Sequence, residues 1–117
     1  MNKVILIGRL GADPELRSTG SGKSVCNLRV ATSDGSGERK ETTWHAVIAW
    51  EKQAELCAKY LAKGRLIGVE GRIQVREYDD KDGNKRKAFE IVAHHVEFLD
   101  KGDARDSDGR GDDNVSF

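Results

Sequence analysis

Aromatic and basic side chains recur along two segments that read as β-strands, and together they could hold a planar, charged ligand. Trp44 and Trp50 stand six residues apart, so in a regular strand both side chains leave the same face. In a second segment, Tyr78 shares a face with Arg76 and Arg72. Aromatic rings stack on any nucleic-acid base, and arginine contacts phosphates whatever the base order. This pattern favours a surface for unpaired nucleic-acid strands.

Both groups of residues also have an ordinary structural explanation. A tryptophan in a strand is often buried, so Trp44 and Trp50 could be core residues, and periodicity alone does not choose between the two interpretations. The arginines could belong to a solvated strand face. Their aromatic neighbours favour the binding interpretation.

A charged segment after Tyr78, EYDDKDGNKRK, supplies further cations around a predicted hairpin turn at Asp82-Gly83. Its basic residues could form a flexible finger, or the segment could be an ordinary polar hairpin tip. The cations of this finger are Lys81, Lys85, Arg86 and Lys87. The full predicted contact set is Trp44, Trp50, Tyr78, Arg72, Arg76, Lys52, Lys85 and Lys87.

The elements that would position these residues are five strands and one helix. Runs rich in β-branched residues predict strands over residues 3–10, 23–32, 42–49, 65–78 and 88–98. Apolar residues at helical spacing predict a helix over residues 51–63, with Gly64 as its C-terminal stop. This mainly β order, with the helix between strands three and four, is that of the five-stranded oligonucleotide/oligosaccharide-binding (OB) barrel. A fold alone does not establish a function.

Charge divides the chain into a basic body and an acidic tail. The 117 residues suit one domain, and their net charge is zero. Residues 1–99 hold 17 Lys and Arg against 14 Asp and Glu, whereas residues 100–117 hold 3 against 6. Because the second segment has almost no apolar residues, we expect a disordered acidic tail after a single domain that ends near Leu99.

The composition argues against several other classes of protein. No apolar run approaches the roughly 20 residues that span a bilayer, so we expect a cytoplasmic, nucleoid-associated protein without a membrane partner. The two cysteines, Cys26 and Cys57, form no CxxC pair, and we expect two buried reduced thiols.

The sequence also contains no recognisable motif for binding a metal or a cofactor. His45 and the pair His94-His95 have no third ligand at metal spacing. The run DDKDGN, which holds Asp79, Asp80 and Asp82, misses the ligand spacing of a calcium loop. We expect no bound metal and no cofactor.

Several ordered motifs resemble the bacterial and phage single-stranded DNA-binding protein family. They are residues 2–10 (NKVILIGRL), 13–17 (DPELR), 31–33 (ATS), 43–47 (TWHAV), 60–64 (YLAKG) and 69–73 (VEGRI). Agreement at successive places over about a hundred positions is far more specific than any one motif.

The resemblance implies a role for each aromatic residue and an assembly. Trp44, Trp50 and Tyr78 would occupy three base-stacking positions, and stacking tolerates the exchange of one aromatic type for another. It also implies a homotetramer wrapped by DNA, with His45 near a subunit contact. The implied function is protection of single-stranded DNA in replication, recombination and repair.

Two departures from the family pattern stand out. The loop after residues 31–33 reads DGSGERKE and lacks the aromatic that many relatives carry there, so affinity could be lower or the footprint different. Ser116 replaces the usual proline near the end of the tail. The tail residues Asp112, Asp113, Val115 and Phe117 are expected to fill an apolar pocket, rimmed by basic groups, on a partner protein. The alternative is a merely solubilising tail.

Three rival functions stay open at this point. An enzyme has no assignable nucleophile, phosphate loop or carboxylate pair, so we expect no catalysis. An oligomeric adaptor would use the barrel only to assemble subunits. A barrel specific for RNA or for one sequence would show different preferences among nucleic acids.

Overall fold

The computed structural model describes residues 1–35 and 37–100. The chain runs through β1 (Val4–Leu10), β2 (Glu15–Ser18), β3 (Ser24–Asp34), the 3-10 turn η1 (Gly37–Arg39), β4 (Glu41–Trp50), α1 (Glu51–Tyr60), β5 (Leu66–Asp79) and β6 (Lys85–Phe98). In this part of the chain, no helix has both the length and the apolar character needed to cross a membrane. Residues 101–117 of the predicted tail lie outside the described residues.

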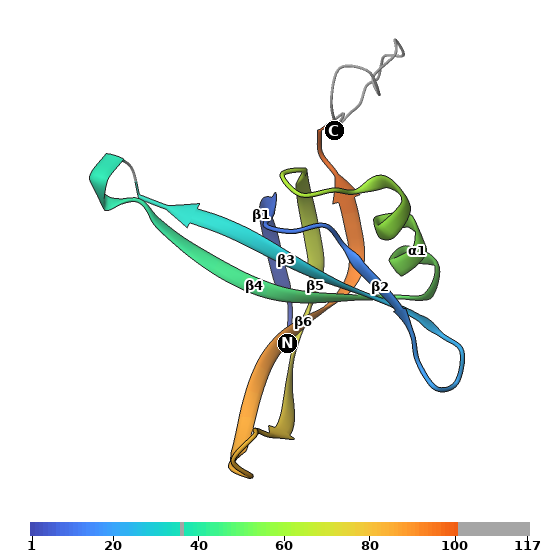
Figure 1. Ribbon diagram of the computed structural model, residues 1–117. Helices are drawn as coiled ribbons and strands as arrows, with labels where there is room; N and C mark the ends of the chain where they lie inside the picture. The colour runs from blue at the N-terminus through green and yellow to red at the C-terminus, as the bar shows by residue number, and fades with distance from the viewer. Residues whose placement is uncertain (36, 101–117) are drawn as a thin grey trace.

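One curled sheet forms the body of the molecule, with strand order β1-β5-β6-β4-β3-β2 (Figure 1). The five long strands close into a ring because β1 also pairs with β3, through Arg9 with Ala31 and Leu10 with Val30. Helix α1 lies between the third and fourth of these long strands. The prediction of a mainly β OB fold is confirmed, although the closure is too short to make a regular barrel.

A missed strand and the end of the helix are two differences from the prediction. Strand β2, which pairs with β3 at the edge of the sheet, was missed because all four of its residues are exposed and show no apolar alternation. The helix ends at Tyr60 rather than residue 63, and Leu61 turns to extended backbone while its amide still donates to the Cys57 carbonyl. Gly64, with φ 92°, falls in the turn that follows rather than at the helix end.

Two hairpins project from the ring as arms (Figure 1). The first arm is made by the distal parts of β3 and β4, which stay paired as far as Asp34 and Glu41. The second is made by β5 and β6, paired as far as Asp79 and Lys85. Its turn is organised by Asp80, whose Oδ1 accepts hydrogen bonds from two backbone amides, each 2.9 Å long. The predicted turn at Asp82-Gly83 is confirmed.

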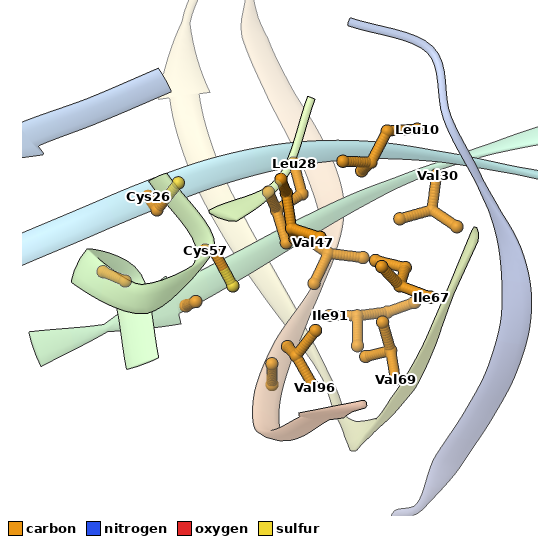
Figure 2. Packing of buried hydrophobic residues seen from close by; sticks show 14 residues of the cluster. Leu10, Cys26, Leu28, Val30, Val47, Cys57, Ile67, Val69, Ile91 and Val96 are labelled. Atoms are coloured by element: carbon orange, nitrogen blue, oxygen red, sulfur yellow. The ribbon is translucent and has the colours of Figure 1, made fainter. Parts of the chain in front are cut away.

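The interior of the ring is filled by small and branched apolar side chains (Figure 2). Leu28, Val47 and Ile67 are almost fully buried at its centre. Cys26 and Cys57 are free and buried where β3 meets α1, as expected. Burial disfavours a thiolate, so the pKa of Cys57 rises to about 12. These thiols therefore serve as core residues rather than as nucleophiles.

A β-bulge marks the point where the second arm leaves the ring. Glu70 pairs with His95, whereas the next residue, Gly71, pairs with Ala93, so His94 is an extra residue on β6. A Cβ atom at Gly71 would overlap the Val92 carbonyl oxygen, which explains the glycine at this crossing. As a result, both His94 and His95 are exposed.

Candidate nucleic-acid interface

The two tryptophans lie on one face of the first arm. Trp44 stands opposite Ala31 and Trp50 opposite Val25 in the register of β4 with β3. Their side chains are 51% and 40% exposed, so neither is a core residue. Strict alternation in β4, in which Val47 and Ala49 point inward, keeps both indoles on the outer side.

The second arm adds a further exposed aromatic ring and guanidinium groups. Tyr78 is 43% exposed, and Arg76 and Arg72 precede it on the same side of β5. Strand β6 links the first arm to the second, because Val92 pairs with Arg72 of β5 and with Ile48 of β4. We name this surface the aromatic face, and its defining residues are Arg29, Trp44, Trp50, Arg72, Arg76 and Tyr78.

Trp44 is held between an arginine and a glycine. The guanidinium carbon of Arg29 lies 5.0 Å from the centre of the indole, a cation–π distance. On Gly11, a Cβ atom would overlap the six-membered ring of Trp44. The indole therefore lies where only a glycine leaves room for it.

Trp50 sits at an abrupt change of direction. It is the last residue of β4 and the residue preceding the first turn of α1, and its side chain makes no cap hydrogen bond there. The next residue, Glu51, has φ 55°, in the left-handed region that costs a non-glycine residue energy. This backbone turns the chain straight from strand to helix and leaves the Trp50 ring at the edge of the aromatic face.

Arg76 links the aromatic ring of Tyr78 to a buried carboxylate. Its guanidinium carbon lies 5.3 Å from the Tyr78 ring centre. Its Nε donates to Glu90 Oε2 over 3.1 Å, and its Nη2 lies 3.0 Å from the same oxygen in an ion pair. This bonding to Glu90 raises the pKa of Arg76 above its ordinary value. The arginine is therefore held in one place before any ligand arrives.

The structure separates the predicted lysines of the second arm from Tyr78. Lys85 pairs with Asp79 and Lys87 with Glu77, so both lie on the side of the arm opposite Tyr78. The residue paired with Tyr78 is Arg86, whose Nε donates to Asp80 over 2.8 Å. Lys52 is exposed in the first turn of α1, two residues beyond Trp50.

Two basic residues of this surface escaped the sequence prediction. Arg29 lies over Trp44, and Arg17 of β2 stands opposite Val25, beside Trp50. Arg29 could have been predicted to lie on the outer face of β3, because it alternates with the buried Leu28 and Val30. Arg17 carried none, since β2 has no alternating pattern.

The histidines lie away from the aromatic face. His45 is half-buried on the inner side of β4, and its Nε2 lies 2.9 Å from Thr32 Oγ1. His95 Nε2 lies 2.7 Å from Glu97 Oε1 on the outer side of β6. Among residues 1–35 and 37–100, no group of His, Cys, Asp and Glu side chains is arranged to hold a metal ion. The predicted tail residues Asp112, Asp113, Val115 and Phe117 lie outside the described residues.

Comparison with known proteins gives consistent matches. The model of the single-strand binding protein family matches residues 1–99. "Single-stranded DNA-binding protein 1" of Chlorobaculum tepidum is 50% identical over 115 residues, covering 93% of this chain and 69% of the relative. "Single-stranded DNA-binding protein" of Neisseria meningitidis serogroup A is 51% identical over 104 residues, covering 85% of this chain but only 60% of the relative. "Single-stranded DNA-binding protein 3" of Clostridium acetobutylicum is 44% identical over 126 aligned positions, covering 100% of this chain and 88% of the relative.

Replacing Gly11 with alanine is expected to displace the Trp44 indole, because the new methyl group would occupy the space of its ring. The emission of Trp44, measured alone in a Trp50→Phe background, should shift when its surroundings change. Gly20→Ala is the matched control, since no heavy atom lies within 4 Å of a Cβ there. Identical emission spectra for Gly11→Ala and its parent would contradict this packing.

Proposed function

Because the chain belongs to the single-strand binding protein family, we propose that it binds single-stranded DNA without reading the order of bases. Bases would stack on Trp44, Trp50 and Tyr78, while guanidinium groups neutralise the phosphates. The observation that carries this proposal is the exposure of all three rings, two of which lie beside an arginine.

Features of the aromatic face support binding without sequence readout. Stacking on an exposed ring is open to every base, because each base has a π-face. The cation–π pairs of Arg29 with Trp44 and of Arg76 with Tyr78 put positive charge beside two of the stacking rings. A phosphate next to a stacked base therefore finds a cation nearby.

From this binding mode follows a protective role. We propose that the chain covers single-stranded DNA during replication, recombination and repair, as a cytoplasmic binding protein rather than an enzyme. The aligned part of the chain covers 69% and 60% of the length of two of its relatives.

The outer side of β1 supports the proposed homotetramer. Ile5 is 70% exposed and Ile7 is also exposed, and both point away from the core. Within the described residues, β1 pairs with β3 only at Arg9 and Leu10, so the edge of β1 before them is open to another strand. Exposed apolar side chains beside an open strand edge suit a subunit contact. His45 is proposed to lie near a subunit contact.

The acidic tail is the proposed recruiting segment. Its role rests on residue types: Asp112 and Asp113 precede Val115 and Phe117. Carboxylates and an aromatic side chain suit an apolar pocket with a basic rim on a replication or repair protein. With Ser116 in place of a proline, more chain freedom is lost on docking, so weaker binding is expected.

Removing either tryptophan ring should weaken binding without unfolding the protein. Trp44→Ala and Trp50→Ala are each expected to cost about 1–3 kcal/mol of binding free energy, the usual contribution of one stacked base. The measurement is quenching of tryptophan emission in a titration with oligo-dT at two salt concentrations, where added salt should weaken binding.

Tyr60→Ala is the matched control for this experiment. Tyr60 is 51% exposed, like Trp44, but lies on α1, away from the aromatic face. Its loss should leave affinity unchanged. Equal affinities for all three variants and the parent would refute stacking, and salt-insensitive or absent binding would favour the adaptor function. A strong preference for RNA or for one sequence would favour the third interpretation.

Charging the outer side of β1 should break up the assembly. The double variant Ile5→Lys, Ile7→Lys is expected to have a lower native mass than the tetrameric parent, because burying each isoleucine contributes about 1.5–3 kcal/mol. Sedimentation equilibrium measures the mass. Leu56→Lys changes an exposed apolar residue of α1 and should leave the mass unchanged. A monomeric parent protein would refute the tetramer.

Deleting residues 112–117 should separate DNA binding from recruitment. Affinity for oligo-dT is expected to stay within about twofold of the parent, because the aromatic face is intact. Pull-down of helicase, nuclease or primase partners should be lost, and Phe117→Ala should weaken it more than the control Asn114→Ala. Unchanged pull-downs after the deletion would leave a solubilising role for the tail.

A further inference from the structure

The second arm leaves the ring at the bulge between Glu70 and Gly71. Before this point β5 has a strand on each edge, because β1 pairs with it as far as Val4 with Gly71. Beyond this point β5 continues to Asp79, and within the described residues its only strand neighbour there is β6. A bulge bends a strand and increases its twist. The direction of the arm is therefore decided within a few residues of the bulge.

Asn2 supports β5 on the far side of this bulge. Its Nδ2 donates to the Ile73 carbonyl oxygen over 2.8 Å, and its Oδ1 accepts from the Ile73 amide over 2.9 Å. In the register of β1 with β5, where Val4 stands opposite Gly71, residue 2 falls opposite residue 73. The side-chain amide thus makes the two hydrogen bonds that a strand backbone would make in this position.

Ile73 belongs to a row of residues that crosses the base of the second arm. It pairs with Ile91 of β6, and Ile91 pairs in turn with Val47 of β4. The arm is therefore held by β4 on the β6 side, while on the β5 side Asn2 takes the place of a strand. Figure 1 shows the N-terminus at the base of this arm. Such a contact fixes the angle at which the arm leaves the ring.

We propose that Asn2 is a positioning residue for DNA binding, an inference that rests on the proposed function and deepens it. Asn2 holds the second arm in the direction that presents Tyr78 and Arg76 to the strand. At about 3.3 Å per residue, Tyr78 lies about 17 Å beyond Ile73, so a rotation of about 10° at Ile73 moves its ring by about 3 Å. Trp50 belongs to the first arm and does not depend on this contact.

A double-mutant cycle tests the role of Asn2, using the full chain and its affinity for oligo-dT. Asn2→Ala is expected to weaken binding by about two- to tenfold, because the arm loses two hydrogen bonds that hold it. In a Trp50→Ala background this factor should be unchanged. In a Tyr78→Ala background it should be smaller, because the arm then has less to present. Equal factors in the two backgrounds would overturn the positioning role.

Two further variants control this cycle. Ser24→Ala removes another exposed side-chain hydrogen bond, from Ser24 Oγ to Glu55 Oε2 over 3.0 Å, which joins β3 to α1 rather than supporting the second arm. It should leave affinity unchanged. Asn2→Gln keeps the amide on a longer side chain and should retain more affinity than Asn2→Ala. A loss in Ser24→Ala equal to that in Asn2→Ala would also contradict the proposal.

A second measurement needs no DNA. In native-state hydrogen exchange, the Ile73 amide should exchange faster in Asn2→Ala than in the parent, because its acceptor is gone, while the Val47 amide should not change. Unchanged exchange at Ile73, or a lower native mass of Asn2→Ala together with equal factors in the cycle, would overturn the role of Asn2. Absence of oligo-dT binding by the parent would overturn the proposed function instead, and leave the exchange result at Ile73 standing.

Discussion

The parallel pairing of β4 with β6 joins the two arms into one surface. It consists of two residue pairs, Val47 with Ile91 and Ile48 with Val92. Val47 and Ile91 face the core, while Ile48 and Val92 continue the aromatic face between the tryptophans and Tyr78. Beyond this junction the arms diverge (Figure 1), so a short contact decides how the rings of the two hairpins are placed relative to one another.

Guanidinium groups, rather than ammonium groups, suit this surface for a physical reason. A guanidinium has five donors in a rigid plane and can stack on a ring. Arg76 donates one hydrogen bond to Glu90, forms an ion pair with it and still lies over Tyr78, which leaves donors for a phosphate. The lysines of the second arm lie on its other face. Cations that are already positioned lose little conformational freedom when DNA binds.

Alternation of side chains made most of the fold and part of the site predictable. Five long strands and one helix follow from local patterns, and the period of two in β4 puts Trp44 and Trp50 on one face. The face of the second arm on which Lys85 and Lys87 lie was not predictable, because the pairing of β6 with β5 depends on how the turn closes. The bulge at His94 was hidden too, since an extra residue in a strand leaves no mark on composition.

Spacing along β4 constrains how a strand of DNA can lie. Six residues at about 3.3 Å each separate the attachment points of Trp44 and Trp50 by about 20 Å. Two neighbouring bases could not reach rings that far apart, so in the proposed binding mode the two rings would hold separate parts of one strand. The phosphates between them would then pass Arg29, which pairs with Ala46 between the two tryptophans. Because the backbone ladder of β3 and β4 fixes this separation, the ring spacing is set before DNA binds.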